Sequence, residues 1–262
     1  MAGSTIALPV DVRWMNHAAS ALMVLAGAAV LAAGVLWLGR TPLFPVRYIQ
    51  LEGDLQRNSV STIRANAMPR LSGNFFGADL QRARQAFEAV PWVRKAVVRR
   101  VWPDGLAVRL EEHRAVALWK GTDDHDRLVN QVGEVFEANV GDVEDEDLPR
   151  LAGPEGSAPQ MVQMLAQLKD LFARHDRSLD LLALSGRGSW RAELDGGADI
   201  ELGRGSPEEV LARVRRFVDT ITQVTGHFKA PVLHADLRHP DGYAVRLRNV
   251  TIASPAPAQR RN

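Results

Sequence analysis

Hydrophobic and polar positions divide this chain into one long apolar run and a following stretch of alternating and helical patterns. From Ala18 to Gly39, 22 consecutive residues carry no charge and only one polar side chain, Ser20. An α-helix of this length measures about 33 Å, which is enough to cross the hydrocarbon core of a bilayer. Residues 18–39 are therefore predicted to form one transmembrane helix in contact with the lipid bilayer, after a short N-terminal segment, residues 1–17.

A cleaved secretory signal is the alternative interpretation of this run. Such a signal has a shorter apolar core, with small residues at a cleavage site just beyond it. Here the run ends in bulky residues before Arg40, and Trp14 and Trp37 stand where interfacial aromatic anchors belong. These features favour an uncleaved anchor. The few charges beside the run do not decide which side of the membrane the long C-terminal part occupies.

Residues 44–113 follow the order strand, helix, helix, strand, strand. A β-type run over Val46–Leu51 comes first. Capping candidates Asn58, Ser59 and Asp79 then precede two sets of apolar residues at helical spacing. The first set is Val60, Ile63, Ala67 and Leu71, and the second is Leu80, Ala83, Phe87 and Val90.

Two β-type runs, Val93–Val101 and Leu106–Glu112, complete this segment. The sequence Trp102-Pro103-Asp104-Gly105 between them predicts a hairpin turn, with Gly105 at positive φ. In the second run apolar residues alternate with Ala107, Arg109 and Glu111, which predicts one buried face and one solvated face.

Residues 115–250 predict a second, mixed domain built on an antiparallel β-sheet with two amphipathic helices. Capping sequences start these helices at Ser157 and at Ser206, with Gln160 and Glu209 as the capping-box partners. The strands are expected at Val116–Trp119, Leu128–Phe136, Leu179–Leu184, Trp190–Leu194, Ala198–Leu202, Val232–Arg238 and Tyr243–Arg248. The fold class is thus α+β, and the Pro- and Arg-rich tail, residues 251–262, is predicted to be disordered.

Candidate chemistry is sparse. The chain has no cysteine, which excludes disulfides, thiolate metal sites and Cys nucleophiles. Its seven histidines form no helical metal-binding pair, and the acidic run Gly141–Asp147 lacks the spacing of a calcium loop, so it is predicted to be a solvated loop. A net charge of +1 gives no reason to expect a nucleic-acid partner. We predict no catalytic, cofactor-binding or metal site, and no enzymatic activity.

A basic run, Arg94, Lys95, Arg99 and Arg100, falls on one predicted strand. Because neighbours on a strand point to opposite faces, Arg94 and Arg100 share one face and Lys95 and Arg99 the other. A solvated strand is the simpler interpretation. Contact with anionic lipid headgroups is the alternative.

The order of these elements matches a known module. Phe44-Pro45-Val46, Gly73-Asn74-Phe75-Phe76, Pro91-Trp92-Val93 and Trp102-Pro103 resemble the POTRA domain of the FtsQ/DivIB family of bacterial cell-division proteins. Val116-Ala117-Leu118-Trp119, Leu128-Val129-Asn130 and Asp236-Leu237-Arg238 are similar to the second, β domain of that family.

The resemblance implies a non-enzymatic, bitopic scaffold in the bacterial inner membrane at the division septum. Its N-terminus would be cytoplasmic, and its POTRA domain, residues 44–113, and β domain, residues 115–250, periplasmic. The β domain would bind the small divisome proteins FtsB and FtsL, and the POTRA domain would contact other divisome membrane proteins. No cofactor is implied.

The last predicted strand is the hypothetical partner-binding site, because a strand before a disordered tail is expected to lie at a sheet edge. Positions that are aromatic in better-known relatives are His239 and Leu247 here, which shifts the expectation from side chains to main-chain pairing. Either Ala244 or Val245 would then donate its N–H to the partner. The full candidate set is His239, Asp241, Gly242, Tyr243, Ala244, Val245 and Leu247.

Two other function classes fit the same elements. A POTRA-bearing chaperone or transport component of the outer membrane usually has tandem POTRA modules and a barrel, whereas this chain shows one module behind a helix. A membrane-anchored periplasmic hydrolase would need a nucleophile that the sequence patterns do not reveal.

Overall fold

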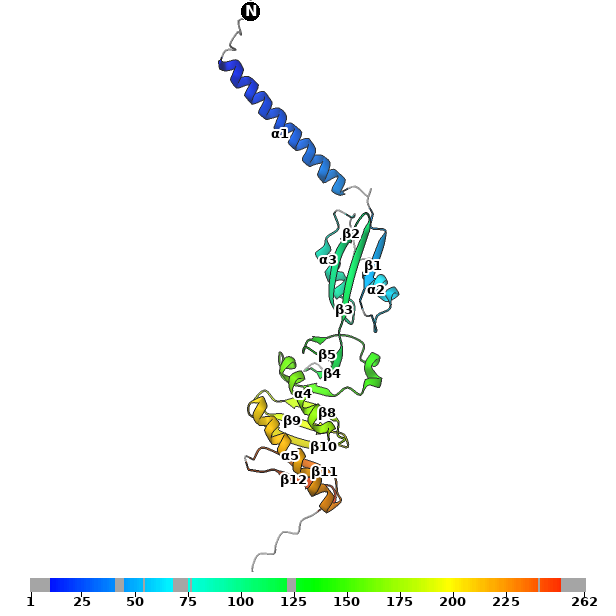
Figure 1. The fold of residues 1–262 in the computed structure, drawn as a ribbon, viewed down its shortest axis with the longest axis vertical. Coiled ribbons are helices and arrows are strands. Elements are labelled where there is room, and N and C mark those ends of the chain that lie inside the picture. Colours follow the sequence, from blue (N-terminus) through cyan, green and yellow to red (C-terminus); the bar gives the residue numbers. More distant parts are fainter. Residues whose placement is uncertain are drawn as a thin grey trace, which may run out of the picture. The chain divides into compact units, whose positions relative to one another are not determined.

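The computed structural model describes residues 10–40, 45–53, 55–67, 75, 77–121, 126–239 and 241–250 (Figure 1). The chain divides into two compact units, Met1–Glu112 and His113–Asn262, which are described separately. The predicted α+β fold, with one apolar N-terminal helix and a POTRA-type order of elements, is confirmed. The predicted disordered tail lies outside the described residues.

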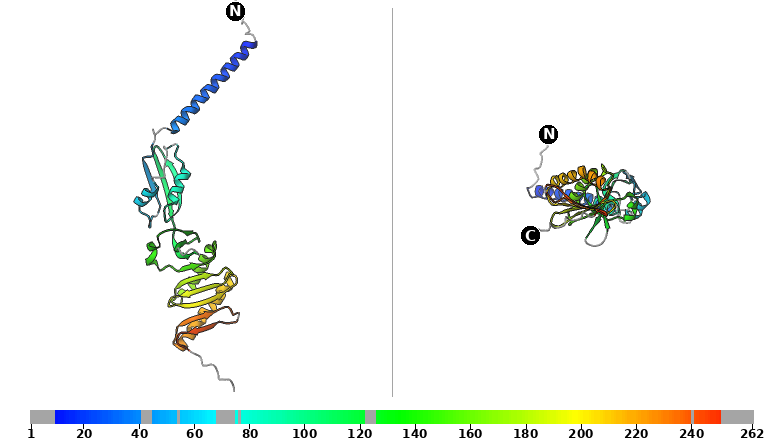
Figure 2. Two further views of the ribbon diagram at one scale, coloured as in Figure 1. Left: turned by 180° about the vertical axis from the view of Figure 1, so that it is seen from behind. Right: turned by 90° about the horizontal axis from the view of Figure 1, so that it is seen from below.

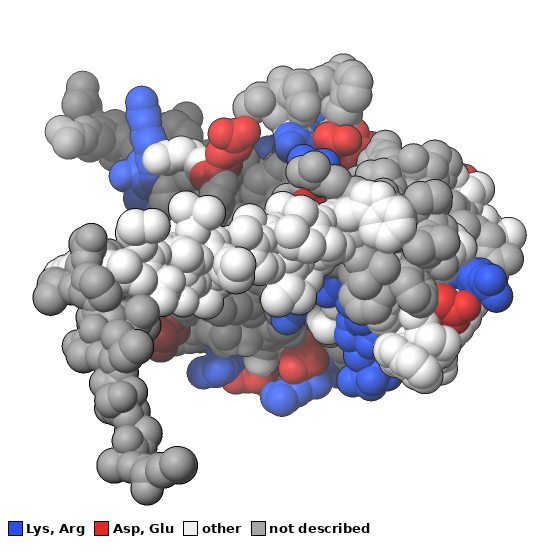
Figure 3. Space-filling model, turned by 90° about the horizontal axis from the view of Figure 1, so that it is seen from above, with Lys and Arg blue, Asp and Glu red and all other residues white. Residues whose placement is uncertain are grey.

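Helix α1 spans Val10–Arg40 and is longer than the predicted apolar run. Its large apolar side chains are exposed on all sides, from Leu36 at 60% to Met23 at 76%. Figure 3 shows it as an uncharged white cylinder. A helix that is apolar all round needs an apolar environment. The stretch Trp14–Trp37 has the length and composition to cross a membrane, and α1 is thus a candidate membrane anchor.

The rest of the first unit is a three-stranded sheet covered by two helices. Its elements are β1 (Tyr48–Glu52), α2 (Val60–Ala67), α3 (Leu80–Glu88), β2 (Val93–Val101) and β3 (Gly105–Glu112). The strand order is β1-β3-β2, with β3 parallel to β1 and antiparallel to β2. Ile63 of α2 and Phe87 of α3 are buried against Val108 and Leu110 of β3, which places both helices on one face.

The predicted helix starts are partly confirmed. The Asp79 carboxylate accepts hydrogen bonds from the N–H groups of Gln81 and Arg82, and so caps α3. At α2 the Ser59 hydroxyl accepts from the N–H of Thr62, whereas Asn58 is buried and donates its side-chain amide to the carbonyl of Pro91. The apolar stripe of α2 is wrong at Val60, which lies on the first turn and is 49% exposed, whereas Ile63 is fully buried. Leu71 lies outside the described residues.

The β2–β3 turn forms where predicted, but the expected role of Gly105 is wrong. Its φ is not positive. Instead, a Cβ at this position would lie 2.2 Å from Cζ of the Tyr48 ring, which covers Gly105 from the neighbouring strand. Close packing, rather than a left-handed backbone, therefore favours glycine here.

In the second unit the described residues form one nine-stranded sheet. Its strands are β4 (Ala115–Lys120), β5 (Asp126–Asn130), β6 (Val135–Phe136), β7 (Arg150–Ala152), β8 (Leu179–Leu184), β9 (Trp190–Leu194), β10 (Ala198–Gly203), β11 (Val232–Asp236) and β12 (Ala244–Leu247). They lie in the order β12-β11-β10-β9-β8-β7-β4-β5-β6.

The sequence analysis predicted an antiparallel sheet, but the sheet is mixed. The pairs β4–β7, β7–β8 and β10–β11 are parallel. Helix α4 (Ala158–Ala173) links β7 to β8, and α5 (Pro207–Phe228) links β10 to β11. Parallel neighbours need such long crossovers, whereas a hairpin turn suffices for antiparallel ones.

Both helices cover one face of the sheet and contact each other (Figure 1, Figure 2). The core lies between this helix layer and the sheet. From the helices it takes Met161, Leu168, Val214 and Phe217, and from the sheet residues such as Trp190.

The two serine caps differ. At α5 the Ser206 hydroxyl accepts from the N–H of Glu209, and the Glu209 carboxylate accepts from the N–H of Ser206, so the predicted capping box is confirmed. The predicted box at α4 is wrong, because Ser157 has helical backbone angles and its hydroxyl donates to the carbonyl of Pro154.

The acidic run Gly141–Asp147 also differs in structure from the prediction. Residues Val140–Glu146 form a short 3₁₀ helix, η2, rather than a loop. The side chain of Asn139 accepts from the N–H of Gly141 at its start, and Val143 is buried and fixes it to the domain.

Candidate functional site

The final hairpin forms one edge of the large sheet. Strand β12 pairs with β11 in antiparallel register, from Asp236 opposite Ala244 to Val232 opposite Leu247. Within the described part of the chain, β12 has no strand on its other side. The edge position expected from the sequence is therefore present, and three of the candidate residues, Ala244, Val245 and Leu247, lie on the edge strand itself.

The register shows which main-chain groups face outward. The N–H of Arg248 donates to the carbonyl of Pro231 on the β11 side, at 2.9 Å. Because N–H groups alternate along a strand, those of Arg246 and Ala244 also point toward β11. The irregularity in this pairing lies on β11, so β12 keeps its alternation. The main-chain groups of Val245 and Leu247 are left facing away from the sheet.

Side chains of this edge hold it to the domain. Leu247 is 7% exposed and belongs to the core. Tyr243 packs edge-on against the ring of Phe217 in α5, with ring centroids 5.1 Å apart, and its hydroxyl is hydrogen-bonded to that of Thr220 at 2.7 Å. Exposed side chains on the strand are those of Ala244 and Arg246. The outward main chain, rather than an aromatic patch, is thus the accessible feature.

The connection between the strands carries the remaining candidates, His239, Asp241 and Gly242, which are exposed or half-buried. Just before it, Arg238 folds back on Asp236 at the end of β11. Its backbone N–H and its Nε both donate to Oδ1, at 3.0 and 2.9 Å. The guanidinium hydrogen bonds hold the pKa of Asp236 well below its usual range.

A histidine of the same hairpin, His234, lies beside an ion pair formed by the two preceding strands. Nδ1 of His234 on β11 lies 3.4 Å from Oδ2 of Asp199 on β10, and the same carboxylate accepts a 2.6 Å hydrogen bond from Nε of Arg191. The hydrogen bond to Asp199 raises the pKa of Arg191. His234 therefore joins a surface ion cluster.

A cavity of about 480 Å³ lies at the start of β11, between the end of α5 and the β9–β10 turn. Apolar side chains including Phe172 and Phe217 line its interior, and Lys229 and Arg248 lie at its polar part. The lining also includes His175, Asp195, Thr222 and Thr225. The Thr225 hydroxyl donates to the carbonyl of Ile221, and the Asp195 carboxylate accepts from the N–H of Ser178. It adjoins the last residue of the hairpin, Arg248.

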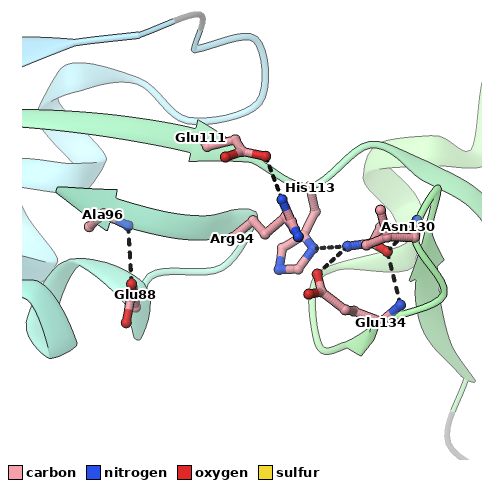
Figure 4. Close-up of polar contacts among 8 residues, drawn as sticks. Glu88, Arg94, Ala96, Glu111, His113, Asn130 and Glu134 are labelled. Carbon is pink, nitrogen blue, oxygen red and sulfur yellow. Dashed lines mark hydrogen bonds and ion pairs between the residues drawn. The ribbon is translucent and has the colours of Figure 1, made fainter.

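A buried polar group that the sequence analysis missed is Asn130, at the end of β5 (Figure 4). Its Oδ1 accepts from the N–H groups of Val132 and Glu134, and its Nδ2 donates to the Glu134 carboxylate at 2.6 Å. Nδ2 also lies 2.9 Å from Nδ1 of His113, which stacks on Phe136 at 3.9 Å. The bonds to Val132 and Glu134 hold the β5–β6 turn, and the contact with His113 ties this turn to the segment before β4, which makes this a structural network.

The basic run of the first unit is mostly paired within its own fold. Arg94 contacts Glu111 at 2.6 Å (Figure 4), and Arg99 contacts Glu52 at 2.8 Å. Arg100 donates to the carbonyls of Phe75 and Ala78. These bonds favour the interpretation as a solvated, internally paired strand. Among the described residues no cluster of three or more His, Asp or Glu side chains could hold a metal ion.

Known proteins resemble the chain along most of its length. The family model "POTRA domain, FtsQ-type" matches residues 44–113, and "Cell division protein FtsQ/DivIB, C-terminal" matches residues 117–238. Cell division protein FtsQ of Burkholderia pseudomallei (strain K96243) is 42% identical over 237 residues, which are 90% of this chain and 93% of the relative. The chain belongs to the FtsQ/DivIB family of cell-division proteins.

Further members of the FtsQ/DivIB family show the same extent of similarity. Cell division protein FtsQ of Bordetella pertussis is 40% identical over 90% of this chain and 92% of its own. That of Thiomonas arsenitoxydans is 35% identical over 97% of both chains. The resemblance read from the sequence is confirmed, and a role in cell division follows from the family. The C-terminal family match ends at residue 238, before β12 begins.

Proposed function

We propose that this chain is a non-enzymatic, single-pass scaffold of the division machinery, anchored in the inner membrane by α1, with both folded units in the periplasm at the septum. Its β domain would bind FtsB and FtsL by strand addition to β12. The POTRA domain would contact other divisome membrane proteins. Family membership supports the division role, and the apolar length of α1 supports the anchor.

The observation that carries this proposal is the outer side of β12, beside which no other strand lies in the described residues. Natural proteins usually protect sheet edges, because an exposed row of N–H and C=O groups recruits other strands. A segment of the partner that pairs along β12 would satisfy the outward groups of Val245 and Leu247. Such main-chain pairing tolerates the absence of aromatic side chains at His239 and Leu247.

Two proline substitutions test the strand addition. Val245→Pro removes an outward N–H and adds a ring on the partner's side, but keeps the bonds to β11. We expect the chain to stay folded and to bind a peptide from the periplasmic part of FtsB roughly tenfold more weakly or worse, given ~1 kcal/mol for the hydrogen bond plus the clash. Titration of the full-length chain in lipid nanodiscs measures this.

Ala244→Pro and Val245→Ala are the matched controls. Ala244→Pro removes an N–H that points to β11, and we expect it to destabilise the β domain. Val245→Ala shortens the side chain but keeps the outward N–H, so it should bind nearly as well as the wild type. If folded Val245→Pro captures the FtsB peptide with unchanged affinity, the β12 edge is not the binding site.

A further inference from the structure

We propose that the β2–β3 turn of the first unit docks on the bilayer surface, with Trp102 inserted among the lipid headgroups. The surface consists of Trp102, Pro103, Asp104 and the neighbouring Arg47 and Tyr48, and we call it the Trp102 turn. This proposal rests on the proposed transmembrane role of α1. It concerns a second membrane contact, made by the folded unit.

The exposure of Trp102 is the first observation. It is 80% exposed, more than any other exposed large apolar side chain in the described residues, those of α1 included. The tryptophans of the folded units outside this turn, Trp92, Trp119 and Trp190, are at most 3% exposed. An indole left in water forfeits a large apolar burial, which indicates a surface that something else covers.

Chain connectivity limits where this turn can be. The N–H of Arg47 donates to the carbonyl of Asp104 at 2.9 Å, and Nε of Arg47 lies 3.5 Å from Oδ2 of the same residue. Arg47 follows the end of α1, at Arg40, by seven residues. Seven residues span at most about 25 Å even when fully extended. The Trp102 turn therefore stays close to the membrane that α1 crosses, however the folded unit is oriented.

The Trp102 turn lies at the end of the sheet where the chain enters from α1. Tyr48, the first residue of β1, pairs with Gly105, the first residue of β3. Tyr48 is itself 42% exposed. Tryptophan and tyrosine are the residues that concentrate at membrane–water interfaces, where an apolar ring and a polar N–H or O–H are both accommodated.

The pairing of the nearby charges favours insertion of the Trp102 indole into the bilayer over electrostatic attraction by basic side chains. Arg99 is bonded to Glu52, and Arg100 to two carbonyl groups. Arg47 faces Asp104, although its side chain is 74% exposed. Attachment would thus depend on the indole, and we expect it on bilayers without net charge.

Fluorescence quenching in full-length protein tests the contact. Trp14 and Trp37 flank the membrane helix, so both are replaced by Phe, and the chain is reconstituted in vesicles of phosphatidylcholine brominated on its acyl chains. We expect brominated lipid to quench part of the remaining emission. That quenched part should be absent when Trp102→Phe is added, since the other tryptophans are buried within the folded units.

Val97→Trp, made in the chain that lacks Trp14, Trp37 and Trp102, is the matched control. Val97 is 51% exposed in the middle of β2, five residues from Trp102 and about 17 Å along the strand. A tryptophan there should be quenched by aqueous acrylamide and not by brominated lipid. Equal lipid quenching of both positions would overturn a contact specific to the turn.

The experiment distinguishes a failure of the Trp102 docking proposal from a failure of the transmembrane assignment of α1. Lipid quenching of Trp14 and Trp37 in the otherwise unmodified chain reports the insertion of α1. If these are quenched while Trp102 is reached only by acrylamide, the turn does not dock on the bilayer, and the anchor stands. If neither is quenched by lipid, the transmembrane assignment itself is wrong.

Discussion

Gly105 lies opposite Tyr48 in the pairing of β1 with β3, and the Tyr48 ring occupies the space that a Cβ would take. Gly105→Ala should lower the free energy of unfolding by about 1–3 kcal/mol, the usual range for an overpacked site. Denaturant unfolding of the full-length chain measures this. Because the obstacle is one side chain, Tyr48→Ala should recover much of the loss in the double variant. Strictly additive effects of the two substitutions would refute this contact.

Asp236 makes the stability of the β domain depend on pH. Its pKa is lowered chiefly by the hydrogen bonds from Arg238. A carboxyl with a lowered folded pKa adds stability above its unfolded pKa, near 3.9, and this stability is lost as the pH falls toward the folded value. Asp236→Asn should therefore cost about 1 kcal/mol at pH 7, since the Arg238 partner is exposed and screened.

The difference between the wild type and Asp236→Asn should remain constant from pH 7 to about 5 and shrink below about 4. Urea unfolding at several pH values in this range checks it. Glu193→Gln, on β9 and two strands away from β11, is the control for the loss of a carboxylate charge. A difference that grows on acidification would have the wrong sign for this ion pair.

Among the helices, α4 and α5 begin with similar sequence signals and differ in structure. Ser206→Ala should destabilise the β domain by about 1 kcal/mol, because it removes the acceptor for the Glu209 N–H at the start of α5. Ser157→Ala should cost clearly less, since the Ser157 side chain caps no N–H of α4. Thermal unfolding of the two variants compares them directly. Equal losses would show that the cap contributes nothing specific.

Local signals explain which elements the sequence could predict. Alternation and helical spacing are properties of neighbouring residues, and they located the hairpins, α3 and the cap of α5. The prediction failed at Ser157 because this residue already has helical backbone angles and turns its hydroxyl to the Pro154 carbonyl, which the local sequence pattern does not reveal. The parallel strand pairs were missed because they join segments separated by whole helices.

The candidate site also has features that the sequence could predict and features that it could not. Its place on the last hairpin could be predicted from the strand patterns of Val232–Arg238 and Tyr243–Arg248 and from their position before the tail. That Tyr243 is fixed to Phe217 and Thr220 could not, because those residues lie more than twenty positions away. The choice between Ala244 and Val245 as the outward donor required one long-range bond, from Arg248 to Pro231.

For the whole molecule, two separate cores carry the fold. The buried cluster around Phe87 and Val108 belongs to the first unit, and the cluster around Leu182 and Trp190 belongs to the second, with no residue in common. Each cluster combines helix and sheet residues from its own unit. We therefore expect that the proposed partner contact on β12 and the proposed membrane contact of the Trp102 turn can be altered separately by substitution.

The orientation of the chain in the membrane is a property of the whole molecule. Asp11 and Arg13 before the apolar run and Arg40 and Arg47 after it give no clear charge bias. Long domains cross largely regardless of flanking charge, so the proposed periplasmic orientation is tested directly. We expect a reporter that is active only in the periplasm to be active when fused after Asn262, and inactive when fused before Met1.

The fusion must also stay in the membrane fraction at full length, because the bulky end of the apolar run does not favour cleavage. A soluble product shortened by roughly forty residues would identify a cleaved signal instead of an anchor. Activity of the N-terminal fusion, with silence of the C-terminal one, would place β12 in the cytoplasm. Strand addition to β12 by a periplasmic segment of FtsB would then be impossible, so the topology test also decides whether the proposed scaffold can work.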